Sequence, residues 1–533
     1  MIIGLDGAEW DLLNLLIKEG VMPNIQKLKD GGVHGVLKST IPPVTAPAWA
    51  SFSTGKNPGK HGCFDFIKLE STLTDIKIVN RSDIKGKTFY EILDERGFKC
   101  ICINLPLSWP PRIKNGIITA SITTKGNRKI FPERLLYKFP VLQGYRITPN
   151  FSLVKRGKLA EYVEDIRRLE KIRFECAKVL FRTIDWDLFF VLFSGTDFIQ
   201  HHLYDKLINS KNEHGAIELY RDIDSYIGWF KRNSPSKTNV FIVSDHGFTT
   251  YHGIFYVNEW LMRENYLDVC PRKIRKNTNY EVVKSINRTG TRKKVRTKIT
   301  SLVFRCLIKL KFSARLYGLI KKLKPLDTDF TFEPMLENTI AYCPTYESWG
   351  IYINSRKKFS NGIVDEKEYK MIRSEIILKL RSLKDPKTGD PLFKAVLGKE
   401  EIYKGPYLRQ APDIIFIPNN YYYYTHIRMG MHLPLTTNLI HNYHAPDEIF
   451  IAYGPDIKEG KKIHRIRIYD IAPTILHMFN VPIPSDMDGK VLKEVFRKDS
   501  KFNKREVRYK QRDERNGIRE KIRELRKKNN IIS

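Results

Sequence analysis

The chain has 533 residues, and its 92 lysines and arginines against 59 aspartates and glutamates give a formal net charge of +33. An apolar content of 42% excludes wholesale disorder, and the length exceeds that of one minimal domain. No uncharged apolar run reaches the roughly 18 residues that a membrane-spanning helix needs, so we expect none.

The cysteines and the first residues bear on the cellular compartment. Seven cysteines at irregular spacing do not form the pattern of a disulfide framework. Cys100 and Cys102 lie in an apolar run, FKCICINLPL, which favours a buried strand over a metal site. The opening MIIGLDGAEWDLL lacks the basic start of a signal peptide. We therefore expect a reducing, cytoplasmic location, with peripheral membrane contact as an alternative.

The positive charge is concentrated in two segments. Residues 271–325 contain 18 lysines and arginines against one acid, and residues 497–533 contain 15 against six. The remainder is only mildly basic, as an ordinary enzyme domain can be. We therefore expect a catalytic core in two parts, residues 1–270 and 326–496, with a basic, helical insertion at 271–325 and a basic tail at 497–533.

Strand-like and helix-like segments alternate along the proposed core. The expected strands are 2–6, 32–40, 99–107, 187–195, 239–245, 338–343, 349–354, 412–418 and 447–454. The expected helices are 8–30 with a break at Pro23, 83–98, 157–183, 216–233, 372–383 and 469–479. Helices between apolar, β-rich runs indicate parallel crossovers. The sequence therefore predicts an α/β fold with a mostly parallel central sheet flanked by helices.

Metal-binding side chains follow three of these strands. Asp6 ends the first strand, Asp197 follows the strand at 187–195, and Asp245 and His246 lie at the end of the strand at 239–245 and just beyond it. His201 stands four residues after Asp197, so a helix would place both on one face, where they can chelate one ion. Ligands of an open parallel sheet bind outside the carboxyl ends of its strands. These groups are therefore expected at one rim, which suggests a two-metal hydrolase.

Two further elements complete the candidate site. Thr45 lies in the proline-bounded turn of PPVTAPAWASF, which exposes its hydroxyl at the entry to an expected helix, a position that favours an oxyanion. His444 precedes the strand at 447–454 and is the remaining candidate ligand, with His441 as its competitor.

Together these pieces resemble the alkaline phosphatase superfamily, and most closely its type I phosphodiesterase/nucleotide pyrophosphatase branch. The resemblance is carried by GLDG, by TAPA followed by TGKNPGKHG, by DxxxH, by SDHG and by a late HxPxxxFxxxGP. It runs from Met1 to about Phe496 and is interrupted by the basic segment. It implies an alkaline-phosphatase-like fold and two divalent metal ions, usually zinc, with manganese as the alternative.

The resemblance also implies roles for individual residues. Thr45 would be the nucleophile, with its oxygen beside one of the metals. The implied ligands are Asp197, His201 and His444 for one metal, and Asp6, Asp245 and His246 for the other. Nucleotide-specific members place an asparagine where this chain has Phe66, so its substrate contacts are expected to differ. Lys56 and His61 are the candidates to supply the missing donor.

The role of the basic insertion has three competing interpretations. Its apolar residues alternate with cations at helical spacing, which suits a lid packed over the substrate or a helix lying on an anionic membrane surface. Nucleic acid is less favoured, because aromatic residues are sparse. The expected substrate is a phosphorylated small molecule, a nucleotide or a lipid-linked phosphate; the oligomeric state stays open.

The favoured function is that of a metal-dependent phosphodiesterase or phosphohydrolase that cleaves a phosphoester or pyrophosphate bond. One alternative is a phosphotransferase acting on a lipid or glycan substrate. The other is a degenerate protein that binds an anion or a membrane without catalysis. The complete set of metal-binding residues argues against degeneracy.

Overall fold

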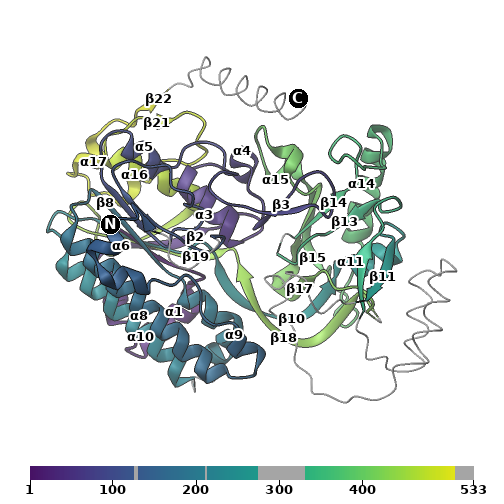
Figure 1. The fold of residues 1–533 in the computed structure, drawn as a ribbon, viewed down its shortest axis with the longest axis horizontal. Helices are drawn as coiled ribbons and strands as arrows, with labels where there is room; N and C mark the ends of the chain where they lie inside the picture. The colour runs from purple at the N-terminus through teal and green to yellow at the C-terminus, as the bar shows by residue number, and fades with distance from the viewer. Residues whose placement is uncertain (125–129, 210–212, 274–329, 348, 432, 511–533) are drawn as a thin grey trace.

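A computed structural model describes residues 1–124, 130–209, 213–273, 330–347, 349–431 and 433–510 (Figure 1). The chain forms a large lobe around a nine-stranded sheet and a small lobe beside it, linked by long strands. The predicted insertion at 271–325 lies almost entirely outside the described residues, and so does the tail from residue 511 onward.

The central sheet is mostly parallel, as predicted. Its order is β20-β2-β19-β9-β1-β8-β5-β6-β7. The strands are β1 (Ile2–Leu5), β2 (Val33–Lys38), β5 (Cys100–Ile103), β6 (Ile117–Thr119), β7 (Ile130–Phe131), β8 (Leu188–Phe193), β9 (Val240–Val243), β19 (Asp447–Tyr453) and β20 (Lys461–Arg467). β1 pairs in parallel with both β8 and β9, so these three strands end at the same edge. β19 is antiparallel to β2 and β9, and β7 is antiparallel to β6.

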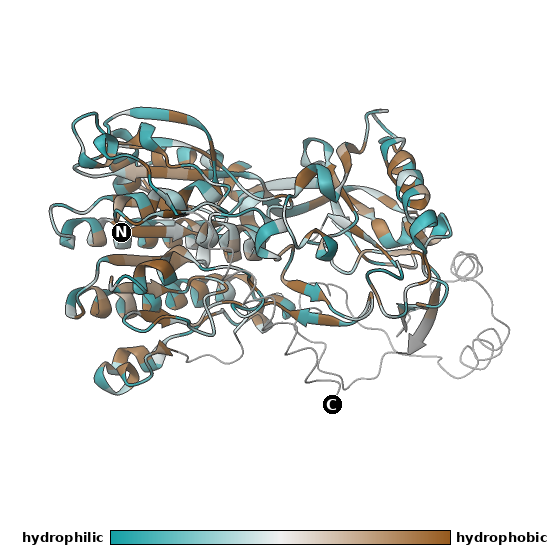
Figure 2. Cartoon of the chain, turned by 90° about the horizontal axis from the view of Figure 1, so that it is seen from above, coloured by the Kyte–Doolittle hydropathy of each residue, from teal (hydrophilic) through white to brown (hydrophobic). Residues whose placement is uncertain are grey.

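Helices cover both faces of this sheet. One face carries α1 (Trp10–Lys18), α2 (Pro23–Asp30), α8 (Leu159–Thr183), α9 (Gly195–Asn209) and α10 (His214–Asn233). The other carries α3 (Thr45–Thr54), α5 (Phe89–Asp94) and α16 (Ile471–Met478). The break at Pro23 is confirmed, because this proline begins α2. In Figure 2 the helices are banded in brown and teal, as expected for helices with one apolar and one polar face.

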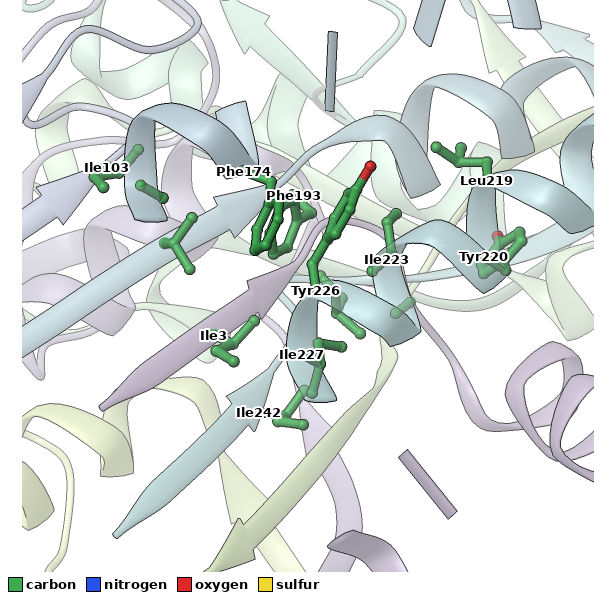
Figure 3. Packing of buried hydrophobic residues seen from close by; sticks show 14 of the residues in the cluster. Ile3, Ile103, Phe174, Phe193, Leu219, Tyr220, Ile223, Tyr226, Ile227 and Ile242 are labelled. Atoms are coloured by element: carbon green, nitrogen blue, oxygen red, sulfur yellow. The ribbon is translucent and has the colours of Figure 1, made fainter. Parts of the chain in front are cut away.

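Alternation along the strands divides the core into two layers. Ile3 of β1 points toward α8 and α10, where Phe174 and Tyr226 stack with ring centroids 4.2 Å apart (Figure 3). Ile2, one residue earlier, belongs to the opposite layer with Trp49 of α3. Successive strand side chains point to opposite faces, so strands buried on both sides need continuous apolar runs. This is why the predicted strands could be recognised as uninterrupted apolar segments.

The small lobe has its own sheet. Its strands run in the order β13 (Ala341–Tyr342), β14 (Gly350–Ile353), β16 (Ile414–Pro418) and β15 (Phe393–Gly398), and all of them pair antiparallel. The helices α11 (Val257–Arg263), α14 (Glu366–Arg381) and α15 (Lys399–Ile402) belong to this lobe (Figure 1). The strands expected between 338 and 418 therefore build a separate sheet and do not extend the central one.

A three-stranded ribbon joins the lobes. β10 (Gly247–Tyr256) lies between β17 (Tyr423–His426) and β18 (Leu435–Ala445), and β10 and β18 are antiparallel. Both long strands reach from the edge of the central sheet to the small lobe (Figure 1). β11 (Val269–Lys273) and β12 (Phe330–Pro334) form a separate pair on either side of the undescribed segment.

The packed core extends beyond the predicted boundary at Arg497. After α17 (Lys501–Lys504), the strand β22 (Tyr509–Lys510) pairs with β21 (Ile483–Pro484). Phe502 is buried against the apolar layer that contains α16. The high charge density of this segment gave no sign of this apolar contact. Within the described residues, no helix combines the length and the apolar character needed to cross a membrane.

Candidate active site

Three neighbouring strands deliver three carboxylates to one edge of the central sheet. Asp6 directly follows β1, Asp197 lies in the first turn of α9 after β8, and Asp245 lies two residues after β9. The Asp6 amide donates to the carbonyl of Phe193 at 3.0 Å, which fixes the end of β1 against the end of β8. The amide of Gly7 donates to Asp245 Oδ1 at 3.3 Å. The parallel pairing therefore brings together residues that are far apart in the sequence.

Thr45 is the first residue of α3, as expected for a hydroxyl at a helix entry. Its Oγ1 lies 3.2 Å from Nε2 of His246, and the residue is only 5% exposed. Amide groups at a helix N-terminus favour a nearby anion, such as a phosphoryl group.

Asp197, His201 and His444 form one group of potential metal ligands. Asp197 Oδ1 lies 3.3 Å from Nε2 of both histidines, and the two Nε2 atoms are themselves 3.3 Å apart. Two imidazole nitrogens at this distance cannot both carry protons comfortably. A cation between the three atoms suits the arrangement better.

Asp6, Asp197 and His246 form the second group. Nε2 of His246 lies 3.6 Å from Asp6 Oδ1, 3.9 Å from Asp197 Oδ1 and 3.4 Å from Asp245 Oδ2. Asp245 therefore borders this group as expected. Asp197, by contrast, stands between the two groups and reaches both, whereas the resemblance assigned it to one metal alone.

Hydrogen bonds on the far side of two imidazoles orient their lone pairs. Nδ1 of His444 lies 3.1 Å from the carbonyl of Pro43, and Nδ1 of His246 lies 3.1 Å from the carbonyl of Gly247. A carbonyl can only accept, so Nδ1 is the protonated nitrogen in each ring. The Nε2 lone pairs are then free to point into the site, as metal-bound histidines require.

The carboxylates show that the site suits cations. Asp6 Oδ1, Asp197 Oδ1 and Asp245 Oδ2 are buried and have no hydrogen-bond partner among the described residues. Burying such oxygens without a partner is costly, and divalent cations would remove that cost. The mixture of histidine and aspartate ligands suits zinc.

Ionisation in the site follows from burial and from these neighbours. Burial raises the pKa of Asp6 well above its usual value, and the charges of Asp245 and Asp197 raise it further. Burial also acts to raise the pKa of Asp197, but His201 and His444 outweigh it and hold that pKa well below its usual value. Burial lowers the pKa of His444 to about 3, so its ring is neutral near pH 7.

His441 does not join the ligand groups. It lies on β18 three residues before His444, and its ring packs against Tyr424 at 4.1 Å between centroids. The structure thus places His444, and not its competitor, beside the carboxylates.

Lys56 and His61 are held by protein partners. Lys56 Nζ donates to Asp486 Oδ2 at 2.6 Å, and the lysine is only 6% exposed. His61 is fully buried, with Nε2 2.9 Å from Ser51 Oγ and Nδ1 accepting from the Cys63 amide at 3.2 Å. These contacts give both side chains a structural role, and we do not carry them into the site as substrate ligands.

A buried ion pair supports the turn that precedes Asp197. Glu170 and Arg173 of α8 are fully buried and contact each other, and Glu170 Oε1 accepts from the amide of Gly195 at 2.7 Å. Arg173 also donates to the carbonyl of Ile147 at 3.1 Å. Through the hydrogen bond to the Gly195 amide, the pair therefore holds the first residue of α9 in place.

Sequence reasoning missed acidic and aromatic groups beside the ligands. Tyr443 stacks on His444 with ring centroids 4.2 Å apart, and Glu347 interacts with Tyr443 and, through its charge, with Asp65 and Asp197. Burial raises the pKa of Glu347 to about 8 and that of Asp65 to about 6. No sequence motif includes Glu347, which comes from the small lobe. Asp65 directly precedes Phe66, the position at which this chain lacks the asparagine of the nucleotide-specific members.

Comparison with known proteins identifies the family. Residues 1–447 match the family of type I phosphodiesterases and nucleotide pyrophosphatases. The chain belongs to this family. It is therefore a hydrolase of the phosphoester-cleaving class, as predicted. No curated protein matches the chain significantly.

Solved structures support the alkaline-phosphatase-like fold. Phosphonoacetate hydrolase from Sinorhizobium meliloti 1021, in complex with phosphonoacetate, is 16% identical with a TM-score of 0.53 over 88% of this chain and 93% of its own. Human ectonucleotide pyrophosphatase/phosphodiesterase 5 is 12% identical with a TM-score of 0.50 over 94% and 99%. The murine form of the latter, an inactive threonine-to-alanine variant in complex with AMP, also has a TM-score of 0.50 at 12% identity, over 93% and 99%.

Proposed function

We propose that the chain is a phosphodiesterase or phosphohydrolase that uses Thr45 as its nucleophile and two divalent cations, zinc in the first instance. The observation that carries this proposal is the convergence of Thr45 with two overlapping groups of aspartates and histidines at the carboxyl ends of parallel strands. Family membership supports the reaction class.

The two ligand groups suggest which residues would hold each cation. Asp197, His201 and His444 would hold one cation, and Asp6, Asp245 and His246 the other, with Asp197 between them. Cations bound there would lower the pKa of a nearby hydroxyl and withdraw charge from the phosphoryl oxygens.

Residues of the chain orient the nucleophile and the incoming phosphate. Thr45 is fixed at the N-terminus of α3, where the helix amides attract the oxygens of an incoming phosphate. Its Oγ1 forms a new bond to phosphorus while the bond from phosphorus to the leaving oxygen breaks, which gives a phosphothreonine and the released alcohol. Water then displaces Thr45 from phosphorus and restores the hydroxyl. The near-complete burial of the threonine limits competing water during the first step.

Thr45→Ala tests the covalent route, with Thr45→Ser as the matched control. On bis-p-nitrophenyl phosphate, the alanine variant is expected to lose at least about a hundredfold in kcat, because the loss of a nucleophile removes transition-state stabilisation outright. The serine variant should keep measurable turnover. Zinc content, measured by elemental analysis, should be near that of the parent in both.

A residual rate above about a tenth in the alanine variant would show that water attacks directly. Failure of the parent protein to retain any divalent cation would favour the degenerate binding protein. Release of the phosphoryl group to an added alcohol faster than to water would favour the phosphotransferase alternative.

A further inference from the structure

The turn that leads into Thr45 is held from both lobes. On the side of the large lobe, Nδ1 of His444 donates to the carbonyl of Pro43 at 3.1 Å. The amide of Ser39 donates to the carbonyl of Pro446 at 3.0 Å. The proposed chemistry gives no part to the groups that hold the same turn from the other side.

On the side of the small lobe, the turn is held by Tyr403, the residue directly after α15. Its hydroxyl donates to the carbonyl of Ile41, four residues before Thr45, at 2.5 Å. The residue is 1% exposed, and its ring packs against Phe64 with ring centroids 5.1 Å apart. Burial raises the pKa of Tyr403 far above its usual value, so the hydroxyl keeps its proton and remains a donor.

The side chain of Ile41 also packs on the small lobe. It contacts two apolar clusters there, one around Tyr403 and Ile415 and the other around Phe416 of β16. The small lobe therefore fixes both the main chain and the side chain of one residue of the turn. Two contacts of different kinds at one residue leave the turn little freedom to move relative to that lobe.

The residues that follow Tyr403 hold the chain beyond the other end of α3. The carbonyl of Lys404 accepts from the side-chain amide of Asn57 at 2.9 Å, and the amide of Lys404 donates to Asn57 Oδ1 at 3.1 Å. The amide of Tyr407 donates to the carbonyl of Gly59 at 3.0 Å. The two segments approach closely, since a Cβ added at Gly59 would lie 2.7 Å from the carbonyl oxygen of Lys404.

Residues 403–407 thus contact the chain before and after α3, the helix whose first residue is Thr45. The β-branch of a threonine restricts rotation about χ1, so the position of its backbone largely decides where the hydroxyl lies. A reacting group that is misplaced by about 1 Å costs on the order of a hundredfold in rate. The hydrogen bond from Tyr403 is therefore expected to affect the chemical step.

We propose that Tyr403 is a positioning residue for the nucleophile: through the carbonyl of Ile41, the small lobe sets the position of the Thr45 hydroxyl beside the ligand groups. This inference rests on the proposed function, since it takes Thr45 as the attacking group. Tyr403 acts through the backbone of the turn and not by contact with the substrate. The small lobe then contributes to the chemistry by holding α3, in addition to any contact it makes with the substrate.

A purely structural role for the same hydrogen bond predicts a different result. In that case its loss lowers the amount of folded protein, and kcat falls by the same factor whichever side chain attacks. Under positioning, the cost depends on the side chain at position 45. Serine lacks the β-methyl group and rotates more freely about χ1, so its hydroxyl depends less on the exact position of the backbone.

The test measures kcat for bis-p-nitrophenyl phosphate in the zinc-loaded protein, with threonine or serine at position 45. With threonine, Tyr403→Phe should lower kcat about tenfold and leave the zinc content near that of the parent. With serine, the same substitution should cost about threefold or less relative to Thr45→Ser alone. Tyr423→Phe is the matched control, because Tyr423 is also buried and its hydroxyl donates to Asp385 Oδ2 at 2.6 Å. It should change kcat by less than about twofold with either nucleophile.

A second variant keeps the test decisive if Tyr403→Phe fails to fold. Ile41→Val removes one methyl group from the packing of the turn on the small lobe. It should lower kcat about threefold with threonine and less than about twofold with serine. Equal factors with threonine and serine, or a kcat of the variant within about twofold of the parent, would overturn the inference.

Thr45→Ala separates this inference from the proposed function. An inactive Thr45→Ala together with a parent-like Tyr403→Phe defeats the positioning role alone. A Thr45→Ala that keeps more than about a tenth of the parent rate defeats the covalent route on which the inference rests.

Discussion

The buried pair of Glu170 and Arg173 offers a direct test of how the candidate site is held. Glu170→Gln keeps an acceptor for the Gly195 amide but leaves the charged guanidinium of Arg173 fully buried without a carboxylate partner, although it still donates to the Ile147 carbonyl. Breaking a buried ion pair by neutralising one partner costs about 3–5 kcal/mol. We therefore expect the free energy of unfolding of the metal-free protein to fall by roughly that amount.

The double variant Glu170→Gln/Arg173→Met makes the expectation specific. With the uncompensated charge removed, an apolar side chain of similar length fills the space, and the double variant should be more stable than the Glu170→Gln single variant by about 1–3 kcal/mol. Urea denaturation followed by tryptophan fluorescence gives the four free energies of the cycle. Glu161→Gln, in the exposed pair with Lys158, is the control and should change stability by less than about 0.5 kcal/mol.

The outcome also bears on the site. Because Glu170 fixes the turn before Asp197, the single variant should bind zinc more weakly than the parent. If Glu170→Gln costs less than about 1 kcal/mol, or if the two single effects simply add, then the pair is not a coupled support and the reasoning fails.

Three further predictions concern the metals, a buried histidine and a lysine. Chelation should lower the melting temperature, because cations at a thousandfold excess over their Kd stabilise the folded protein by about 4 kcal/mol and neutralise the unpartnered carboxylates. An unchanged melting temperature would argue against a metal centre. His61 has its pKa lowered by burial from 6.5 to about 3, so its contribution to stability is complete above pH 6.5 and is lost as the pH falls toward 3. Between those values His61→Gln should reduce the slope of unfolding free energy against pH by up to about 1.4 kcal/mol per unit, whereas His464→Gln, at an exposed position, should not. Lys56→Met should lower the melting temperature by breaking the contact with Asp486, yet leave kcat/KM within about threefold of the parent; a loss of a hundredfold would return Lys56 to the substrate site.

The parallel part of the central sheet could be predicted because burial on both faces requires continuous apolar strands. Such runs, LFFVLF of β8 for example, are visible without knowledge of their partners. The carboxyl-end rule then brought Asp6, Asp197 and Asp245 together from sequence positions almost 240 residues apart. The apolar runs and the carboxyl-end rule were therefore sufficient to predict this part of the site.

The antiparallel elements were harder to predict. β10 and β18 form a ribbon with mixed polar and apolar residues, so neither shows a run that marks a strand of ten or more residues. The small lobe was taken for a continuation of the core, because strand patterns do not state which sheet a strand joins. Glu347 could not be predicted for the same reason, since its place beside Tyr443 depends on how the small lobe meets the ribbon.

The position of β19 has a consequence for synthesis of the protein on the ribosome. This strand lies between β2 and β9, although more than 190 residues separate it from the nearer of the two in sequence. Until residues 447–453 have emerged, a nascent chain leaves β2 and β9 with open edges, which are templates for pairing with other chains. His444 emerges at almost the same moment. Chains truncated before His444 are therefore expected both to lack this candidate ligand and to aggregate, so about the last sixth of the chain is essential for solubility as well as for chemistry.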